Sequence, residues 1–402
     1  MITKKFKGKG EKVLGANLKS FDAGYHYASD SFKEREKPVL TLPEPEKEKR
    51  ILISGNEAVA RGALDAGLKL YFGYPITPQN ELGEYMAEHL PKSGGVFVQS
   101  ESETAAINMV IGAAAAGARV MTSSSSPGIS LKQEGISFLA GFQLPAVIVN
   151  VMRGGPGLGN IAPAQGDYFQ ATRGGGHGDY RTPVFAPGSV QEVADLTRVA
   201  FDVADRYRTP VMILGDGMLG QMKEPVEFPD MLVDLPEKEW ALRGRGEGAS
   251  RYMASLILDV MEMERHNWEL VRKYQAITKN ETLYEGYMLD DAKIVAIAYG
   301  TTARIARAAI KRVRKEGVPA GLLRPITLWP FPKEPLQELA RRIEDFVVFE
   351  MSTGQMVEDV LLSLEGRGRV AFHGRPGGVV PTPVEFSRIL YREYQRQVKS
   401  EK

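Results

Sequence analysis

The chain has 402 residues, of which 43% are apolar and 25% are charged, a composition typical of globular proteins with two or three domains at this length. Its 51 Lys and Arg residues balance 50 Asp and Glu residues, so the net charge of +1 gives no reason to expect a nucleic acid or an anionic membrane as partner. It has no cysteine, which excludes disulfides, a thiolate nucleophile and a cysteine-ligated zinc or iron–sulfur centre on this chain.

Two further features bear on location. No stretch of about 18 apolar residues occurs, so we expect no transmembrane helix. The first residues, MITKKFKGKGEK, are charged and do not resemble the apolar core of a signal peptide. We therefore expect a cytoplasmic protein.

Residues 1–50 differ in composition from the rest of the chain. They begin rich in lysine, continue with Phe21, Tyr25, Tyr27 and Phe32, and end in a Pro/Glu/Lys-rich stretch, with no sustained apolar period. One interpretation is a disordered tail. The other is an N-terminal arm that lies on a partner, because exposed aromatic side chains are costly in water.

From Ile51 onward, short apolar runs alternate with amphipathic segments. The pattern predicts helices over 56–68, 79–90, 103–118, 128–142 and 189–205, and strands at 70–75, 95–99, 118–124, 145–152, 184–187 and 210–216. The run PAVIVNVM suits a parallel strand that is buried on both faces. Residues 51–225 are therefore expected to form an α/β domain with a doubly wound, mostly parallel sheet.

The rhythm changes after this domain. Residues 226–290 are predicted to be a linker that carries one long helix over 249–278. A second, smaller α/β domain is predicted over 291–390, with strands near 293–300, 320–325 and 345–352, and a tail over 391–402.

Ligands of open α/β sheets bind at the carboxyl ends of the strands. The predicted strands are followed there by polar or glycine-rich segments, at 73–78, 99–103, 122–128, 153–159 and 174–180. Such loops allow backbone N–H groups to approach a polar ligand closely.

Glu103 is the carboxyl of greatest interest in these segments. Ser100 and Glu103 fit the S-x-x-E capping box, so Glu103 could serve only to cap a helix. However, the next fifteen residues carry no charge, so this helix would desolvate the carboxyl, as in many acid–base catalysts. Both interpretations remain open on these residues alone.

Other polar residues also allow two interpretations. Ser123 to Ser126 could form a flexible loop, or bind a carboxylate or phosphate with their hydroxyl and N–H groups. Arg153 could be a surface cation, or a bidentate carboxylate ligand among glycines. His177 could be a structural histidine or part of a site.

A Gly-Asp-Gly sequence at 215–217 resembles the start of a motif that binds Mg²⁺ and diphosphate. In that motif an asparagine follows some 25 to 30 residues later, whereas the first asparagine after Asp216 is Asn267. We therefore expect no metal site for a diphosphate on this chain.

Together these segments resemble the alpha subunit of the 2-oxoacid:ferredoxin oxidoreductases. The resemblance runs from about residue 51 to 390 and leaves residues 1–50 outside it. It rests on GYPITPQNE, Glu103 with Ala106, Gly112 and Ala114, TSSSSPGISL, RGGPGLG and GGGHGDY, and in the second domain on LRPITLWPFP and FEMSTGQM.

The resemblance implies a thiamine-diphosphate pyrimidine-binding fold, followed by a domain like the C-terminal domain of transketolase. It implies that a beta subunit holds the cofactor's diphosphate and Mg²⁺. It also implies that [4Fe-4S] clusters lie on partner chains, such as a gamma or ferredoxin-like subunit, in a dimer of heteromers. The implied reaction is oxidative decarboxylation of a 2-oxoacid to acyl-coenzyme A, with electrons passed to ferredoxin.

The resemblance also implies roles for individual residues. Glu103 would hydrogen-bond the aminopyrimidine ring and favour its imino tautomer, with Glu101 as the rival carboxyl. The remaining assignments are cofactor contacts from Pro75, Ile76 and Thr77, substrate-carboxylate contacts from Thr77 and Arg153, and a pocket lining of Ser124, Ser125 and His177.

Within the family, GYPITPQNE, SSSSPGISLKQEG and GGHGDYR are most similar to the 2-oxoisovalerate (branched-chain) type. The alternatives are a 2-oxoglutarate or aryl 2-oxoacid enzyme, including one that uses an acceptor such as NAD. A non-oxidative thiamine-dependent decarboxylase subunit and a non-catalytic scaffold are further alternatives.

Overall fold

The computed structural model describes residues 2–32, 49–229, 235–244 and 251–400. Its contacts divide the chain into two compact units, Met1–Glu48 and Lys49–Lys402. Each unit is described by itself. No helix in the described ranges is both long and apolar enough to cross a membrane.

The first unit is helical. It contains α1 (Ile2–Phe6), a 3-10 turn η1 (Lys7–Lys9) and the 21-residue helix α2 (Glu11–Ser31), which buries no residue. Of the two interpretations of this segment, a disordered tail is wrong for residues 2–31, which are helical apart from Gly10. A helix makes its backbone hydrogen bonds within the segment, so it can form without a sustained apolar period. The Pro/Glu/Lys-rich stretch, residues 37–50, lies almost wholly outside the described residues.

The second unit is built on a seven-stranded sheet with the strand order β12-β6-β7-β5-β4-β2-β3. All neighbouring strands run parallel except β12, which pairs antiparallel with β6. This confirms the predicted doubly wound, mostly parallel sheet. Its strands are β2 (Leu70–Gly73), β3 (Val96–Gln99), β4 (Val120–Ser124), β5 (Ala146–Met152), β6 (Val184–Phe185), β7 (Pro210–Asp216) and β12 (Thr327–Trp329).

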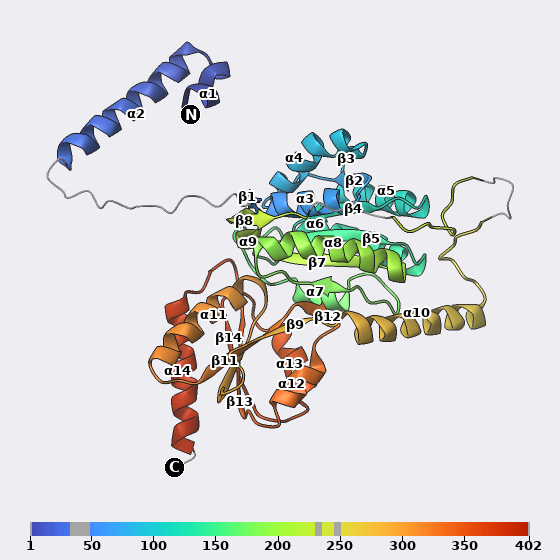
Figure 1. Cartoon of the computed structure of the whole chain (residues 1–402). Coiled ribbons are helices and arrows are strands. Elements are labelled where there is room, and N and C mark those ends of the chain that lie inside the picture. Colours follow the sequence, from blue (N-terminus) through green and yellow to red (C-terminus); the bar gives the residue numbers. More distant parts are fainter. Residues whose placement is uncertain (1, 33–48, 230–234, 245–250, 401–402) are drawn as a thin grey trace. The chain divides into compact units, whose positions relative to one another are not determined.

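Helices cover both faces of this sheet (Figure 1). In β5, Ile148 and Met152 pack with α5 and α6, whereas the alternate residues Val147 and Val149 pack with α3 and α8. This alternation explains why PAVIVNVM is apolar throughout. The helices are α3 (Gly55–Asp65), α4 (Asn80–His89), a short η2 (Pro91–Ser93), α5 (Glu103–Ala115), α6 (Ser126–Gly141), α7 (Tyr168–Arg173), α8 (Val190–Tyr207) and α9 (Gly217–Gln221).

A second sheet of five strands has the order β14-β13-β10-β11-β9. Helices α11 and α14 cover one face, and α12 and α13 pack on the other. The strands are β9 (Tyr284–Tyr287), β10 (Ile294–Ile297), β11 (Ala320–Pro325), β13 (Asp345–Glu350) and β14 (Arg369–Gly374), and the helices are α11 (Gly300–Lys315), α12 (Lys333–Leu339), α13 (Met356–Leu364) and α14 (Pro383–Ser400).

The connecting region departs from the sequence prediction. The long helix α10 spans Val260–Glu281 rather than 249–278, because Asp259 caps its first turn by accepting hydrogen bonds from Met261 N and Glu262 N. In addition, β1 (Arg50–Ser54) and β8 (Lys223–Glu227) form an unexpected antiparallel pair. The predicted domain boundaries stay a prediction, and those at 225/226 and 390 fall inside β8 and α14.

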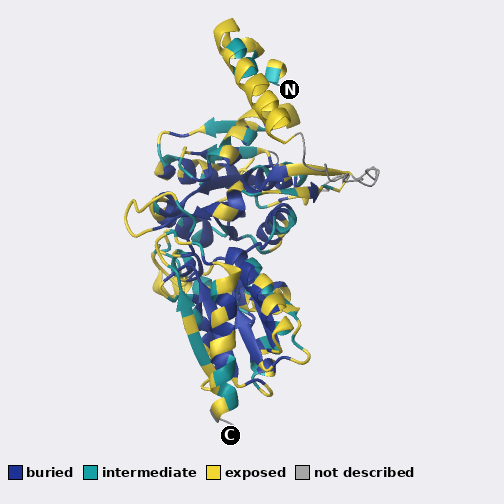
Figure 2. Ribbon diagram, turned by 90° about the vertical axis from the view of Figure 1, so that its left-hand side faces the viewer, coloured by how far each residue is buried: buried dark blue, intermediate teal, exposed yellow. Residues whose placement is uncertain are grey.

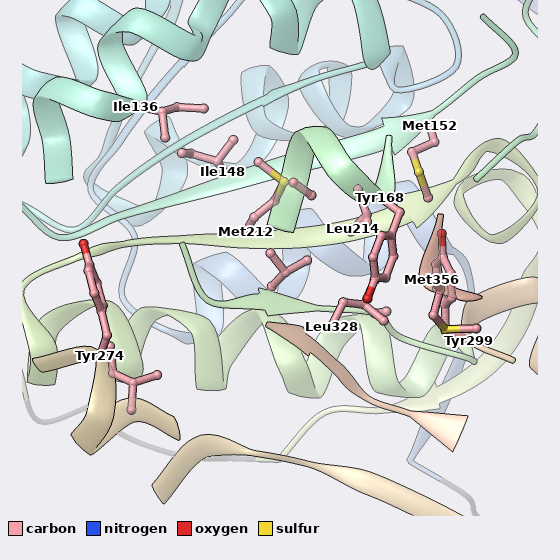
Figure 3. Close-up of a cluster of buried hydrophobic side chains, with 14 of the residues drawn as sticks. Ile136, Ile148, Met152, Tyr168, Met212, Leu214, Tyr274, Tyr299, Leu328 and Met356 are labelled. Atoms are coloured by element: carbon pink, nitrogen blue, oxygen red, sulfur yellow. The ribbon is translucent and has the colours of Figure 1, made fainter. Parts of the chain in front are cut away.

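The two larger sheets share one hydrophobic core (Figure 3). Tyr168 from α7 and Tyr299 from the second sheet's side have ring centroids 5.9 Å apart, and Met356 of α13 belongs to the same cluster. Figure 2 shows the buried residues concentrated in the strands of both sheets. The second sheet thus supports the carboxyl edge of the first, where the predicted site residues lie.

Candidate functional site

Glu103 is the first residue of α5 and lies just after the carboxyl end of edge strand β3. Its neighbour Ser102 is the N-cap, and Ser102 Oγ accepts a hydrogen bond from Ala105 N at 3.1 Å. The proposed capping box between Ser100 and Glu103 is therefore wrong. Glu103 is only 6% exposed, whereas Glu101 is exposed. The structure thus separates the two candidate carboxyls by burial.

The Glu103 carboxylate meets the end of β4 and the start of α6 at one point. A Cβ added to Gly128 would lie 2.0 Å from Ser124 Oγ and 2.6 Å from Glu103 Oε1. The hydroxyls of Ser124 and Ser125 are fully buried, and neither has a hydrogen-bond partner among the described residues. Buried polar groups normally find partners, so this cluster has the free acceptors and donors that a polar ligand requires.

Lys132 adds a charge that the sequence analysis missed. It lies one helical turn after Gly128 and is fully buried, with Nζ donating to Thr122 Oγ1 at 2.6 Å and to Ser123 O at 3.3 Å. The buried residues Ile129 and Ile136 lie three before and four after it on α6. This helical spacing is the signal that could have predicted the burial of Lys132.

The loop that carries Thr77 is held by Arg153, which follows β5. Arg153 Nη1 donates to Thr77 O at 2.9 Å, and Nη2 donates to Leu158 O at 3.0 Å. Its buried Nε finds no acceptor within the described part of the chain. Thr77 and Ile76 are half-buried and Pro75 is exposed, so this loop presents its surface at the same sheet edge.

A second polar network that sequence reasoning missed supports the start of α6. The carboxylate Oδ2 of Asp167 accepts from Ser126 Oγ at 2.6 Å and from Asn150 Nδ2 at 2.9 Å. Burial raises the pKa of the Asp167 carboxyl, while these two hydrogen bonds act in the opposite direction. Ser126 Oγ also accepts from Arg153 N at 3.0 Å, so the network joins α6 to the Arg153 loop.

His177 lies elsewhere. It lines a cavity of about 370 Å³ together with Tyr180 and, from α10, Met263, His266 and Leu270. The structure therefore brings together Glu103, Ser124, Ser125 and, through Arg153, Thr77, but it groups His177 with α10.

A smaller cavity of about 250 Å³ opens beside the loop that precedes Thr77. Aromatic and small residues dominate its lining, with Tyr71, Tyr74 and Phe97 as the largest side chains. The Tyr71 and Phe97 rings stack with centroids 5.5 Å apart, and Tyr71 Oη and Ser123 Oγ are 2.6 Å apart. The cavity is thus tied to the serine segment at the end of β4.

The Gly-Asp-Gly sequence has a structural explanation. Asp216 ends β7 and caps α9, where its Oδ1 accepts from Met218 N at 3.0 Å and from Leu219 N at 3.1 Å.

A buried carboxylate beside free hydroxyls, at the carboxyl edge of a doubly wound sheet, suits the aminopyrimidine of thiamine diphosphate, whose ring edge presents donors and acceptors. The class that this fold and site define is the thiamine-dependent enzymes. Residues 61–282 match the family model described as pyruvate flavodoxin/ferredoxin oxidoreductase, thiamine diphosphate-binding, and residues 292–386 match pyruvate:ferredoxin oxidoreductase core domain II. The chain belongs to this family of 2-oxoacid:ferredoxin oxidoreductases, which confirms the predicted resemblance.

Curated relatives agree with this assignment. A ketoisovalerate oxidoreductase subunit of Methanothermobacter thermautotrophicus is 55% identical over 328 residues, which cover 81% of this chain and 93% of that protein. A 2-oxoglutarate synthase subunit of Archaeoglobus fulgidus is 41% identical over 318 residues, which cover 77% of this chain and 90% of that protein. Both relatives are named as subunits, which supports heteromeric partners for this chain.

Solved structures support the fold. The 2-oxoglutarate:ferredoxin oxidoreductase of Magnetococcus marinus, solved with 2-oxoglutarate, coenzyme A and succinyl-CoA, matches with a TM-score of 0.83 at 26% identity, covering 98% of this chain and 73% of that chain. A split-gene transketolase matches with a TM-score of 0.54 at 15% identity, covering 85% of this chain and 98% of that chain, and this likeness concerns the fold alone.

Proposed function

We propose that this chain is the alpha subunit of a 2-oxoisovalerate:ferredoxin oxidoreductase. In the proposed reaction, 2-oxoisovalerate and coenzyme A give isobutyryl-CoA, CO₂, one proton and two electrons. The observation that carries the proposal is the burial of Glu103 beside the free hydroxyls of Ser124 and Ser125. The similarity to ketoisovalerate oxidoreductase subunits supports the choice of substrate.

Thiamine diphosphate, when bound, supplies the carbon nucleophile for the 2-oxo group and accepts the electron pair that decarboxylation releases. Glu103 is proposed to hold a proton between its carboxylate and the pyrimidine ring nitrogen. Pro75, Ile76 and Thr77 are proposed to contact the cofactor from the facing loop. A buried carboxylate suits this role because the surrounding helix excludes water from the shared proton.

Thr77 and Arg153 are proposed to bind the carboxylate of the substrate, with Ser124 and Ser125 lining the pocket. The hydrogen bond from Arg153 Nη1 to Thr77 O supports a joint action, because the guanidinium fixes the loop that presents the Thr77 hydroxyl. His177 is retained only as a weaker candidate, since its cavity is formed with α10.

We propose that the substrate side chain enters the cavity beside the loop that precedes Thr77, whose lining includes Pro75 but none of Thr77, Arg153, Ser124 and Ser125. Among the described residues that line it, there is no lysine, arginine or histidine, and the single charged one is Glu84. A second carboxylate, as in 2-oxoglutarate, would have no counter-charge there. This supports a branched-chain substrate over 2-oxoglutarate, while an aryl 2-oxoacid is the second candidate because Tyr71, Tyr74 and Phe97 could stack on a ring.

We further propose that partner chains complete the enzyme. A beta subunit would hold the diphosphate and Mg²⁺, and a gamma or ferredoxin-like subunit would hold the [4Fe-4S] clusters, in a cytoplasmic dimer of heteromers. The absence of cysteine from the sequence requires that any cysteine-ligated cluster lie on another chain. Helix α2, with exposed Phe21 and Tyr25, is the proposed arm toward such a chain.

The test is to purify the chain with its native partners, identify them by mass, and screen 2-oxoacids for coenzyme A-dependent reduction of a redox dye. We expect Glu103→Gln to lower the turnover with 2-oxoisovalerate at least 100-fold while the complex still assembles. Glu101→Gln is the matched control, because this exposed carboxyl lies two residues away, and it should keep wild-type turnover.

Other results would support the alternatives. Full activity of the Glu103→Gln complex would contradict the proposed role of Glu103. Free aldehyde in place of acyl-CoA, with no cluster-bearing partner, would favour a non-oxidative decarboxylase. Dependence on NAD in place of ferredoxin would change the electron acceptor but not the proposed site. A complex whose affinity for the cofactor does not change when Glu103 or Thr77 is replaced would indicate a non-catalytic scaffold.

A further inference from the structure

Lys132 is a charged residue in an environment that normally excludes charge. It is fully buried on α6, and its Nζ donates to Thr122 Oγ1 at 2.6 Å and to Ser123 O at 3.3 Å, both at the end of β4. These partners are neutral, so they satisfy donors without balancing the charge. A methionine would fill the same space without the desolvation cost, so packing alone does not explain a lysine here.

Its position explains the charge. Gly128 and Lys132 are four residues apart on α6 and therefore lie on one face of the helix. A Cβ on Gly128 would touch both Ser124 Oγ and Glu103 Oε1, so this face points at the Glu103 carboxylate. Lys132 thus lies on the same helix face as the contact with Glu103, one turn farther along α6.

Glu103 is also the charged group that acts on Lys132. Among the described residues, α5 contributes the Glu103 carboxylate, while β4 contributes the Thr122 hydroxyl and the Ser123 carbonyl, which do not titrate in this range. Burial lowers the pKa of Lys132 to about 7, and the attraction of Glu103 acts in the opposite direction. The amino group can therefore change its charge near neutral pH.

We propose that Lys132 is a positioning residue whose buried amino group provides the counter-charge to the Glu103 carboxylate. Gly128 and Lys132 share one face of α6, and the contact of that face with Glu103 Oε1 carries the proposal. This inference rests on the proposed role of Glu103 and adds the residue that balances its charge.

The first test is the pH dependence of kcat/KM for 2-oxoisovalerate in the purified heteromeric complex. In Lys132→Met, Glu103 loses its counter-charge, so the acidic limb of the profile should move to higher pH. Lys132→Arg keeps a positive charge at every accessible pH, so it should retain the wild-type acidic limb. Both variants are needed, because one of them could fail to fold.

Lys238→Met is the matched control for this profile. Lys238 is also a buried lysine, and it pairs with Asp205 at 2.5 Å away from the Glu103 cluster. Its replacement should leave the shape of the profile unchanged even if the complex is less stable. An unmoved acidic limb in Lys132→Met, with Glu103→Gln inactive, would overturn the inference and leave the proposed function intact.

The second test needs no catalysis. A lysine whose folded pKa lies near 7 binds fewer protons in the folded than in the unfolded chain between about pH 7 and 10, so the melting temperature should rise with pH in that window. Lys132→Met should show a smaller rise, to which Lys273 still contributes because burial lowers its pKa to about 8. Lys92→Met, at an exposed lysine, should keep the full rise. In Glu103→Gln the rise should begin at lower pH, because the amino group has lost its counter-charge.

The two tests separate the possible failures. If the rise begins at the same pH in the wild type and in Glu103→Gln, the two groups are not coupled and the inference is wrong. If Glu103→Gln retains full turnover, the proposed function fails first. A shifted rise together with a shifted acidic limb supports the inference.

Discussion

The guanidinium of Arg153 donates from Nη1 to the backbone carbonyl of Thr77 at 2.9 Å, across 76 positions of sequence. The second terminal nitrogen donates to Leu158 O at 3.0 Å. Arg153 thus ties the loop after β2 to the loop after β5. Since both loops lie at the carboxyl edge of the sheet, one planar side chain fixes the position of the Thr77 hydroxyl.

Arg153→Lys should raise KM for the substrate more than it lowers the free energy of unfolding. A lysine cannot reproduce the fork that reaches two carbonyls in different directions. Losing one charge-assisted hydrogen bond costs about 1.5–3 kcal/mol, so we expect KM for 2-oxoisovalerate to rise about tenfold or more. Steady-state kinetics of the complex measure this. Arg265→Lys, at an exposed arginine on α10, should leave KM unchanged, and an unchanged KM in Arg153→Lys would contradict the argument.

Gly128→Ala tests the convergence of Glu103, Ser124 and α6. The new Cβ would lie 2.0 Å from Ser124 Oγ and 2.6 Å from Glu103 Oε1, so at least one of these side chains must move. We expect the affinity of the complex for thiamine diphosphate to fall at least tenfold, measured by titration calorimetry.

Gly112→Ala is the control for that substitution, since Gly112 also lies within a helix but a Cβ there meets nothing within 4 Å. It should keep wild-type affinity and raise the free energy of unfolding by about 0.5–1 kcal/mol. Equal affinities of the two variants would show that the space around Gly128 is not needed for the cofactor.

The sequence predicted most of this fold because its strongest signals are local. The uninterrupted apolar run of β5 and the glycine-flanked loops after each strand were sufficient to place the sheet and its carboxyl edge. They were not sufficient for strands made by distant pairing, since β1 forms with β8 and β12 joins β6 from the second half of the chain.

The candidate site shows the same limit. Ser100 and Glu103 have the spacing of a capping box, but Ser100 N donates to Gly73 O at 2.8 Å and therefore still belongs to the sheet. Ser102 is consequently the N-cap of α5, and the Glu103 side chain takes no part in the capping. Lys132 was missed because a charged residue is normally placed on a solvated helix face, and only its spacing from Ile129 and Ile136 indicates burial.

Tyr168→Phe tests the contact between the two sheets. Tyr168 Oη donates to Asp359 Oδ2 at 2.5 Å, and Arg173 donates to the other carboxylate oxygen at 2.8 Å. The carboxylate keeps Arg173 in the variant, so we expect a loss of only about 1–2 kcal/mol in the free energy of unfolding, measured with urea. Tyr252→Phe, at an exposed tyrosine, should change nothing, and a loss no larger than in that variant would contradict a stabilising role for the bond.

Asp167→Asn should remove one source of pH dependence from the free energy of unfolding while it keeps the hydrogen bonds at this position. Ser126 Oγ and Asn150 Nδ2 both donate to the same oxygen, Oδ2, so an amide oxygen in that place can accept both. Burial raises the pKa of Asp167 above its ordinary value near 3.8, so the folded wild type binds more protons than the unfolded chain just above that pH.

The contribution of Asp167 to the free energy of unfolding is therefore largest below about pH 4. It is lost as the pH rises through the pKa of this carboxyl in the folded protein. Each pH unit of that elevation corresponds to about 1.4 kcal/mol. Asp167→Asn should lack this fall and equal or exceed the wild type in free energy of unfolding at pH 7. Urea titrations at pH 4, 5.5 and 7 measure the difference, with Asp290→Asn, at an exposed aspartate, as control. A variant that loses stability with pH as steeply as the wild type would show that the buried carboxyl is not the group that titrates.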